Sequence, residues 1–510
     1  FKFVISCLET LLVDLNYGVS VTCVLIINMN PEIEIELNGQ TDKWKVINDS
    51  VHGHFKLHPL MWKIIDTVEF QRLRFIKQLS LASHIFPGAT HTRFEHSLGV
   101  CHLAGKLLNE LQKTSSNITN EDIICVQIAG LCHDLGHGPF SHTWEKFIHL
   151  ANPGFQWKHE VQSVKIFKYL LVKNDVVKDF YSWGLTDVDI QFICELINPQ
   201  DRVSKDSWSY SGRSMNKAFL YEVVANKRNG LDVDKWDYFL RDSHHLGLTI
   251  SFDCDHLIPN IKVIDVPGEL PQLGVRDKEC HSIFEMFYTR LTLHSRAYQH
   301  PINIIIQTML LDALQEANKH LEFTHGQKVF TMAQCVMEED LFISLTDSIM
   351  TQILFSNDPQ LDEAKNKLRA ILLRKFYWII GSVPVRSKPQ EGCILSLIDS
   401  FLNLIPSGTM MERQDLTVEF IDYNFGLGDK NPLDEMKFFQ KSQASASVSP
   451  ANNYINKCYF LPSRFREVIL LLICKRPMNP AQKSEVNSAF EEWSQNCISN
   501  GDEAVDTKGH

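Results

Sequence analysis

The chain has 510 residues, a formal net charge of −11 and a hydrophobic content of 44%. This length allows a large core and more than one domain, and the acidic balance excludes a protein whose whole surface binds nucleic acid. The 13 cysteines are scattered without a CxxC pair, which argues against a zinc finger. We expect reduced thiols in an intracellular protein, in the nucleus or the cytoplasm.

Residues 1–44 form an N-terminal extension that we expect to lie outside the main fold. The apolar run 1–28 is interrupted by Glu9 and Asp14, so it is a poor membrane span. Lys2 ahead of an apolar run is compatible with a signal peptide, but no clear small-residue cleavage site follows. Met29 is an alternative start of the natural chain.

Helical periodicity dominates residues 45–380 and predicts a mainly α-helical domain. Residues 43–54 have the pattern of a loop, and residues 64–74 that of an amphipathic helix with solvated charges. Thr119 and Asp122 form a possible capping box for a helix over NEDIICVQIAGLCHDLGH, which the glycines at 136 and 138 would end. A long amphipathic helix follows over residues 303–321.

The last third predicts a smaller, mixed α/β lobe over residues 381–495. Residues 415–426, DLTVEFIDYNFG, alternate like a strand. Residues 441–453 are rich in Ser, Ala and Asn and predict a loop or a disordered insert. Residues 454–495 have a foldable pattern again, and we expect residues 496–510 to be a frayed tail.

The segment GLCHDLGHGPFSH, residues 130–142, sets ionisable groups into an apolar run, where they need a partner or a metal. His133 and Asp134 together suit a divalent metal. His96 lies upstream in another helical stretch. Several aspartates lie downstream in a single stretch: Asp232, Asp234, Asp237 and Asp242.

Two imidazoles and two carboxylates from these segments would leave coordination positions open for water and substrate, as a catalytic metal site requires. An isolated histidine is more often structural, and a His–Asp dipeptide alone is common. The argument depends on the combination, because all these residues fall in runs that otherwise have the pattern of core.

This H…HD…D pattern resembles the signature of the HD-domain metal-dependent phosphohydrolases. Longer segments resemble the animal SAM-and-HD-domain dNTP triphosphohydrolases over residues 45–435, and weakly to 495. These segments are VINDSVHGHFKLHP, FQRLRFIKQL, FPGATHTRFEHSLGV, CVQIAGLCHDLGHGPFSH, NKRNGLDVDKWDYFLRD and LHSRAYQH. The family's SAM domain has no match in residues 1–44, which are too few and wrongly patterned for it.

The resemblance implies a helical HD core that cleaves dNTPs to a deoxynucleoside and triphosphate, lowering dNTP pools. It implies one divalent metal ion per subunit, without separating Zn, Fe, Mn and Mg, and it allows a second Mg ion with the nucleotide. The implied metal ligands are His96, His133, Asp134 and Asp234. The implied catalytic cluster is His137, His142, Glu145 and His159, and the family usually has Asp where Glu145 stands.

The resemblance also implies which residues contact the substrate. Arg93, Lys235 and Arg290 match contacts to the phosphates. Tyr238, Asp242 and Tyr298 match residues around the sugar, Gln78 and Leu79 match the pair at its 3′-hydroxyl and 2′ face, and His294 and Gln299 match residues near the α-phosphate and the base. A pocket packed against the 2′ carbon would reject a ribonucleotide, and we expect broad tolerance of the base.

A nucleotide-assembled homotetramer with GTP and dNTP activators is implied as well. The residues that match the guanine-nucleotide site are Lys45, Val46, Asn48, Asp66, Gln71 and Arg74. A second nucleotide site between subunits matches Arg276, Lys278, His300, Arg374 and Lys430. Four positions depart from the family, which has an arginine at His256, an asparagine at Ser282 and a lysine at both Pro301 and Trp378.

Two other functions remain open from the sequence. One is a phosphodiesterase or nuclease acting through the same metal site, which product analysis would separate. The other is a catalytically weak protein that binds nucleic acid. The family resemblance adds antiviral restriction, an innate immune role and binding of single-stranded nucleic acid, but no feature of the sequence itself indicates them, and we expect no membrane partner.

Overall fold

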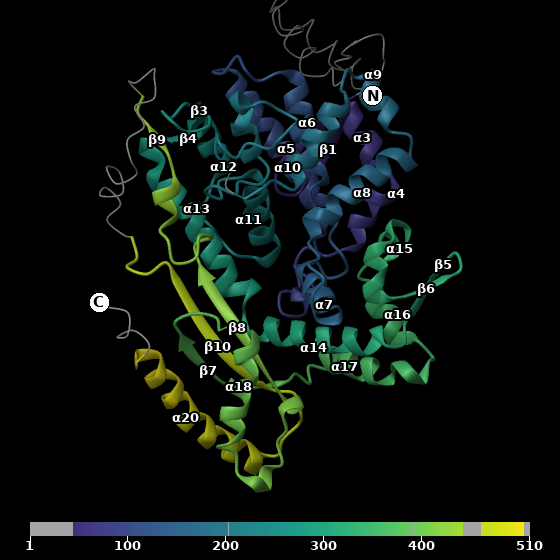
Figure 1. The fold of residues 1–510 in the computed structure, drawn as a ribbon, viewed down its shortest axis with the longest axis vertical. Coiled ribbons are helices and arrows are strands. Elements are labelled where there is room, and N and C mark those ends of the chain that lie inside the picture. The colour runs from purple at the N-terminus through teal and green to yellow at the C-terminus, as the bar shows by residue number, and fades with distance from the viewer. Residues whose placement is uncertain (1–43, 202, 390, 442–460, 504–510) are drawn as a thin grey trace, which may run out of the picture.

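The computed structural model describes residues 44–201, 203–389, 391–441 and 461–503. Figure 1 shows a mainly helical body with small sheets at its edges and a sheet-containing lobe at the bottom, which confirms the predicted fold class. The predictions for residues 1–43, for the insert from residue 442 and for the tail from residue 504 lie outside the described residues. No helix in the described ranges is long and apolar enough to cross a bilayer.

The described chain begins with a β-hairpin where a loop was predicted. Strands β1 (Lys45–Asp49) and β2 (Gly53–Leu57) pair antiparallel. The turn closes because Asp49 accepts the backbone N–H groups of Val51 and His52, at 2.8 and 2.9 Å. Side-chain capping of a turn by aspartate is a local signal, but mixed polarity along both short strands hid the alternation.

The predicted single helix over residues 64–74 is also wrong, because it is broken at Asp66 and Thr67. Helix α3 (Pro59–Ile65) ends there, and the Thr67 hydroxyl caps a new short helix, α4 (Val68–Gln71). A 3₁₀ turn over Arg72–Phe75 follows. Threonine at an N-cap competes with helix continuation, and this break leaves Asp66 exposed at the junction.

Helices α5 (Arg93–Gln112) and α6 (Asn120–Cys132) pack together in the middle of the body. The predicted capping box of α6 is confirmed. The Thr119 backbone N–H donates to Asp122 Oδ2 at 3.0 Å, and the Asp122 backbone N–H donates to the Thr119 hydroxyl at 3.2 Å. The helix ends at Cys132, earlier than predicted, because residues 133–141 turn away. Helix α10 (Asp187–Ile197) packs on α6 and α11 (Val233–Leu246) packs on α5. The other helices of this part are α7 (His142–Ala151), α8 (His159–Lys173), α9 (Val177–Ser182) and α12 (Cys254–Leu257).

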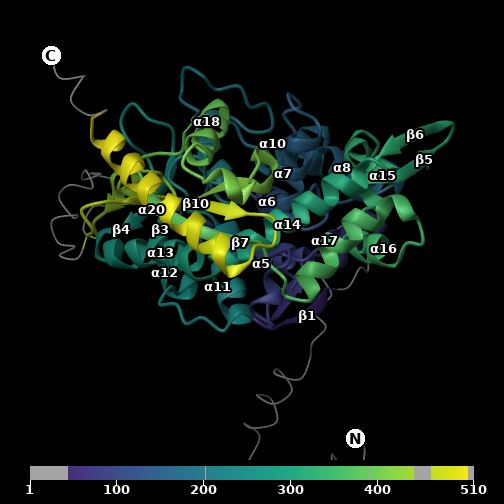
Figure 2. The ribbon, with the colours of Figure 1, turned by 90° about the horizontal axis from the view of Figure 1, so that it is seen from below.

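A second group of helices follows, in which α14 and α17 lie side by side below the body (Figure 1). Its members are α13 (Cys280–Leu293), α14 (Pro301–Asn318), α15 (Glu339–Ser344), α16 (Ile349–Phe355) and α17 (Asp362–Leu372). The hairpin of β5 (Glu322–His325) and β6 (Lys328–Thr331) projects from this group in Figure 2.

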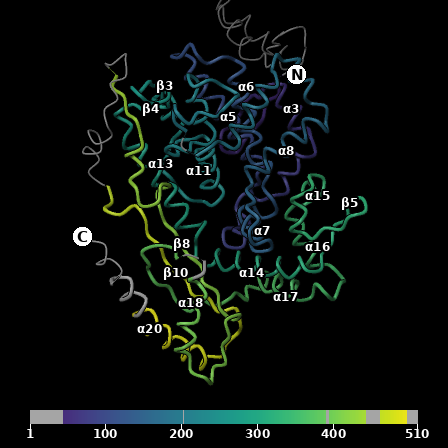
Figure 3. The backbone as a smooth tube through the Cα atoms, viewed as in Figure 1, coloured from purple at the N-terminus to yellow at the C-terminus, as the bar shows by residue number. Residues whose placement is uncertain are grey.

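The lobe is a three-stranded antiparallel sheet in the order β7-β10-β8, made of Trp378–Val385, Arg466–Cys474 and Leu416–Asn424. The strand predicted at 415–426 is therefore confirmed. Helices α18 (Glu391–Leu402) and α20 (Pro480–Glu503) pack on the sheet over a second hydrophobic cluster. The tube in Figure 3 shows the chain leaving the body for this lobe after α17.

The segment after β8 returns to the body. Strand β9 (Phe438–Phe439) pairs parallel with β4 (Gln272–Arg276), which in turn pairs with β3 (Ile261–Ile264). The loop before it packs against α13, the helix that carries Arg290. The segment after β8 thus joins the lobe to the helical body.

Candidate active site

Three separate helices supply the predicted metal ligands. His96 lies in the first turn of α5, whose start is fixed by a capping box between Thr92 and Glu95. His133 and Asp134 directly follow α6, and Asp234 lies in the first turn of α11, where Asp232 is the N-cap. Helix ends and first turns hold these side chains because capped backbone there is well ordered.

The structure brings these ligands together. The ligand atoms of His96, His133 and Asp234 lie within 4.8 Å of one another. Asp234 Oδ1 is 3.1 Å from His96 Nε2 and 3.4 Å from His133 Nε2. Asp134 reaches the same group, with Oδ1 3.3 Å from His133 Nε2 and Oδ2 3.6 Å from His96 Nε2.

The outer nitrogens of the two imidazoles have defined partners. His96 Nδ1 lies 2.7 Å from Asp237 Oδ2, and His133 Nδ1 lies 2.7 Å from the Gly130 carbonyl. His133 Nε2 is buried and makes no hydrogen bond of good geometry within the described residues, although Asp134 Oδ1 and Asp234 Oδ1 lie 3.3 and 3.4 Å away. An imidazole with its far nitrogen fixed and its near nitrogen beside two carboxylates has the form of a metal ligand, so the residues fit a divalent ion.

Electrostatics in this group also favour a cation. Burial alone would lower the pKa of His96, but hydrogen bonds to Asp234 and Asp237 raise it to about 10. Burial opposes ionisation of Asp234, yet the nearby imidazoles of His133 and His96 lower the pKa of that carboxyl. The carboxylates therefore stay charged and attract positive charge, either protons on the imidazoles or a metal ion.

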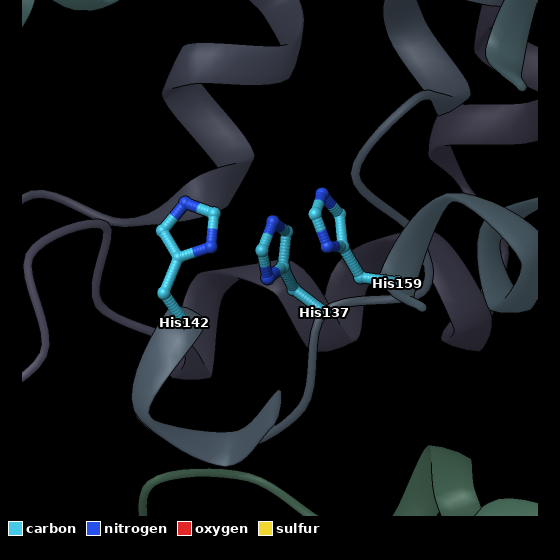
Figure 4. Close-up of side chains that lie close together, drawn as sticks. All are labelled: His137, His142 and His159. Atoms are coloured by element: carbon cyan, nitrogen blue, oxygen red, sulfur yellow. The ribbon is translucent and has the colours of Figure 1, made fainter. Parts of the chain in front are cut away.

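Three more histidines form a stack beside this group, and Figure 4 shows the His137 ring between those of His142 and His159. The His137 and His159 rings stack with centroids 4.0 Å apart, and the His142 ring stands edge-on to His137 at 5.0 Å. Burial, and then the nearby Arg93 cation, lower the pKa of His137 well below its usual value. His137 is therefore a neutral imidazole at pH 7.

Glu145 gives His159 a different setting. His159 Nδ1 lies 2.9 Å from Glu145 Oε2, at the position where the sequence resemblance led us to expect the shorter aspartate. Burial would raise the pKa of Glu145, but its hydrogen bond with His159 lowers that pKa. A carboxylate on one imidazole nitrogen fixes the orientation of the ring and sets which nitrogen faces the cavity.

These groups face a cavity of about 600 Å³. His96 and Glu145 lie behind its lining, whereas the other predicted metal, catalytic and substrate residues line it. Those residues are His133, Asp134, Asp234, His137, His142, His159, Gln78, Leu79, Arg93, Lys235, Tyr238, Asp242, Arg290, His294, Tyr298 and Gln299.

Each of the three predicted phosphate-binding cations has a protein partner. Arg93 Nη1 lies 2.6 Å from Asp134 Oδ2, and Lys235 Nζ lies 2.8 Å from Asp232 Oδ2. Arg290 Nη1 donates to the Asn424 backbone carbonyl at 2.5 Å. All three also line the cavity, so an anion there meets cations held in place.

At the predicted sugar end, the Tyr298 hydroxyl donates to Asp242 Oδ2 at 2.5 Å. The other oxygen of Asp242 lies 2.6 Å from His91 Nε2. His91 is buried and was not predicted, although it lies inside the segment FPGATHTRFEHSLGV. Gln299 bonds His294 Nδ1 at 2.9 Å and the β8 backbone at Asp422, which fixes both side chains.

Other wall residues were missed because no pattern distinguished them from core or surface. Ser141 was missed although it sits between two predicted histidines. Its backbone dihedrals of φ 57° and ψ −125° follow a positive φ of 62° at Phe140. Further unpredicted lining residues are Lys146, Glu160, Lys227, Asn303 and Gln307.

The residues matched to the regulatory sites fall into separate groups within one chain. In the first, Lys45 Nζ lies 3.4 Å from Asp66 Oδ2, and Arg74 Nε donates to Gln71 Oε1 at 2.7 Å. Val46 and Asn48 lie on the adjoining strand β1.

The residues matched to the second site have other partners. Arg374 donates to the His84 carbonyl at 3.1 Å, and the ring of His300 faces Phe86 edge-on. Arg276 is the last residue of β4, Lys278 follows it, and Lys430 lies 3.6 Å from Glu435.

Two of the departing positions share one partner. Glu279 Oε2 lies 3.0 Å from His256 Nε2 and accepts a hydrogen bond of 2.8 Å from the Ser282 hydroxyl. Lys278 Nζ is 3.0 Å from Glu279 Oε1. Pro301 is the first residue of α14, a position that suits its fixed φ. Lys483 lies over the Trp378 ring, 5.1 Å from its centroid.

The comparisons with known proteins agree with this geometry. The family model described as HD domain matches residues 93–239. Deoxynucleoside triphosphate triphosphohydrolase SAMHD1 of Bos taurus is 43% identical over 86% of this chain and 76% of its own length. The protein of the same name from Homo sapiens is 41% identical over 85% and 71%. A SAMHD1 homolog of Dictyostelium discoideum is 32% identical over 89% and 81%.

Proposed function

Because the chain belongs to the family of deoxynucleoside triphosphate triphosphohydrolases named SAMHD1, we propose that it hydrolyses dNTPs to a deoxynucleoside and inorganic triphosphate. The observation that carries this proposal is one cavity that joins a metal-ligand group, a histidine stack and three cations. In the reaction a water oxygen bonds to the α-phosphorus, the bond from phosphorus to O5′ breaks, and a proton goes to O5′.

We assign His96, His133, Asp134 and Asp234 to one divalent metal ion. Two imidazoles and two carboxylates suit Fe, Mn or Zn, since these metals accept nitrogen ligands. The two carboxylates keep Mg compatible with the site. His133 Nε2 supports the assignment, because it lies beside the Asp134 and Asp234 carboxylates without making a hydrogen bond of good geometry. When bound, the ion would supply positive charge beside the oxygens of the α-phosphate.

The histidine stack divides into two roles in this proposal. His159, held by Glu145 through Nδ1, keeps Nε2 for the proton that the leaving O5′ needs. His137, neutral through burial and the nearby Arg93, suits a hydrogen bond to water or phosphate better than donation of charge. His142 lines the cavity beside both and completes the face that we expect to orient the water.

Substrate selection would follow from the rest of the wall. Arg93, Lys235 and Arg290 give the triphosphate positive charge. The Tyr298–Asp242 pair and Leu79 would pack on the sugar and leave no room for a 2′-hydroxyl. Lower dNTP pools would follow in the cell and would limit viral DNA synthesis, which is the basis for an antiviral, innate immune role.

We further propose that GTP and dNTPs activate the enzyme by assembling a homotetramer. The regulatory residues form separate groups in one chain, so a complete site would need a second copy. We place the protein in the nucleus or the cytoplasm, consistent with the nine free cysteines of the described residues. Single-stranded nucleic acid is a further proposed partner.

Product analysis tests the main proposal. The chain, loaded with Mn²⁺ or Fe²⁺, would be incubated with dGTP, with and without GTP, and the products separated by ion-exchange chromatography. We expect deoxyguanosine and triphosphate in equal amounts, formed faster with GTP. Nucleoside monophosphate from dGTP or from an oligonucleotide would instead identify a phosphodiesterase or nuclease, and absence of any product would favour a non-catalytic role.

A further inference from the structure

The turn that precedes His142 has a conformation that L-residues rarely adopt. Phe140 has φ 62°, and Ser141 has φ 57° with ψ −125°. The second pair of angles is close to the first central position of a type II′ turn, which normally requires glycine. Such a backbone persists only when its surroundings hold it, so the residues that hold this turn also determine where His142 points.

Both residues of the turn are held from outside it. The Phe140 backbone N–H donates to Asp347 Oδ1 at 2.7 Å. The Ser141 hydroxyl donates to the Lys77 carbonyl at 2.7 Å and accepts from Arg93 Nε at 3.0 Å. Of these contacts, the one to Asp347 joins the turn to a segment far along the chain.

Asp347 lies between α15 and α16, outside the residues that match the HD domain. Its Oδ2 accepts the Lys77 backbone N–H at 2.9 Å, and its own N–H donates to the Phe75 carbonyl at 3.1 Å. One carboxylate therefore holds the turn before His142 and the backbone that leads to Gln78 and Leu79.

A buried arginine reinforces this connection from the same side. Arg72 Nε donates to the Leu345 carbonyl at 2.9 Å, and Nη1 lies 3.4 Å from the Leu135 carbonyl. Arg72 and Asp347 thus tie residues 345–347 to both ends of the segment 135–140. That segment carries His137 and leads into His142.

We propose that Asp347 is a positioning residue of the active site, which fixes the strained Phe140–Ser141 turn and thereby the place of His142 against His137 and His159. The inference deepens the proposed dNTP hydrolysis and rests on it for its kinetic consequence. Asp347 touches neither the proposed metal ligands nor the phosphate-binding cations. Its loss should therefore lower kcat much more than it alters metal binding or KM.

Asp347→Ala and Asp347→Asn test this in the full chain. The alanine removes both acceptors, and the asparagine keeps one oxygen in nearly the same volume. We expect kcat for dGTP to fall about 10- to 100-fold in the alanine variant, as for a misplaced catalytic group, and less in the asparagine variant. The Mn²⁺ content should equal that of the wild type, and KM should change much less than kcat.

Asp358→Ala is the matched control. Asp358 also accepts a backbone N–H, that of Gln360 at 2.9 Å, in the same part of the chain but away from the cavity lining. We expect wild-type kcat and metal content from it. Wild-type kcat in both folded Asp347 variants, or a fall in kcat matched by loss of metal or of folded protein, would overturn the proposal.

Hydrogen–deuterium exchange gives a readout that does not depend on activity. The Phe140 amide should exchange faster in both Asp347 variants, within a peptide covering residues 136–144, while peptides of α5 and α11 keep their rates. Unchanged exchange in the 136–144 peptide would overturn the proposal. If the alanine variant does not fold, the asparagine variant alone decides this test. If the wild type does not hydrolyse dNTPs but the Asp347 variants still show this faster exchange, the proposed function is refuted and the positioning role of Asp347 is not.

Discussion

Asp134 serves two positive neighbours at once, since its Oδ2 lies 2.6 Å from Arg93 Nη1 and its Oδ1 3.3 Å from His133 Nε2. Asp134→Ala removes one anionic ligand and leaves Arg93 buried without its carboxylate. We expect the bound metal and the rate of dGTP hydrolysis to fall together, the rate by about 100-fold or more. Mutation of a residue that only supports a metal ligand already lowers metal affinity or activity by about 10- to 100-fold. Elemental analysis and product assays measure the two quantities.

Asp340→Ala is the control for this prediction, because Asp340 is an exposed carboxylate paired with Lys173 away from the cavity. It should keep full metal content and rate. An Asp134→Ala variant that kept both would show that the H…HD…D residues do not form the metal site.

The pH dependence of stability supplies a second prediction at this scale. Burial raises the pKa of Asp347 to about 6. Between the ordinary pKa of an aspartate, about 3.9, and about 6, the folded chain holds a proton that the unfolded chain has lost. The stability from this carboxyl is therefore present below about pH 4 and is lost as the pH rises through about 6.

Asp347→Asn has no such titration. The thermal midpoint of the variant minus that of the wild type should therefore increase between pH 5 and pH 7. The change between pH 5 and pH 7 corresponds to about 1.4 kcal/mol, because only the interval from pH 5 to the folded pKa of about 6 contributes and one pKa unit is worth about 1.4 kcal/mol. Midpoints at several pH values, at constant ionic strength, check it. A difference between variant and wild type that stays constant with pH would refute the assigned titration.

Single residues show where sequence reasoning could succeed. The cluster of His133, Asp134, His137 and His142 was accessible because four chemically distinctive side chains stand close together in an apolar run. Asp347 and His91 were not, because each is one ordinary residue in its local sequence. Their roles arise only when the fold brings residues 77, 140 and 347, or 91 and 242, into contact.

At the scale of elements, the turn that follows α6 packs against α8 at Gly136. The backbone N–H of Gly136 donates to Ser163 Oγ at 2.8 Å, and a Cβ on this glycine would lie 2.2 Å from the His159 carbonyl and the Ser163 nitrogen. No flexible side chain can yield there, because both atoms belong to the backbone of α8.

Gly136→Ala should therefore move the start of α8 and carry His159 away from Glu145. We expect a loss of about 1–3 kcal/mol in the free energy of unfolding, as for overpacking of a core, together with a clear fall in kcat. Chemical denaturation and dGTP turnover check the two effects. Gly408→Ala, which has open space around its Cβ, should change neither; equal behaviour of the two variants would contradict the predicted clash.

Elements also show why some local predictions failed. The α6 cap was predictable because its signal is local, a threonine and an aspartate at fixed spacing. The β1–β2 hairpin was not, because its strands are short and half exposed and its turn depends on one aspartate. The helix over 64–74 was broken by a threonine cap that amphipathic periodicity does not detect.

For the whole molecule, the proposed regulatory residues raise the question of assembly. Lys45 pairs with Asp66 and Arg74 with Gln71, while Arg374 and His300 contact the segment that holds His84 and Phe86. Bringing such cations together between copies would be unfavourable without an anion between them. A nucleotide that binds only the assembled form favours it by mass action.

Asp66→Ala should leave the metal content unchanged, yet lose GTP-stimulated assembly and turnover. Sedimentation velocity of wild type and variant, with GTP and dATP, measures assembly directly. Because His256, Ser282, Pro301 and Trp378 depart from the family, the dNTP-filled part of the site is expected to differ most in selectivity. A wild-type monomer or dimer that is fully active would show that assembly is not the switch.

The most direct test of the account is dGTP hydrolysis by the metal-loaded chain in ¹⁸O-labelled water, followed by ³¹P NMR and mass spectrometry of both products. Attack of water on the α-phosphorus at the histidine and metal groups predicts one ¹⁸O atom in the triphosphate and none in deoxyguanosine. Label in the nucleoside, or release of dGMP with pyrophosphate, would contradict the account.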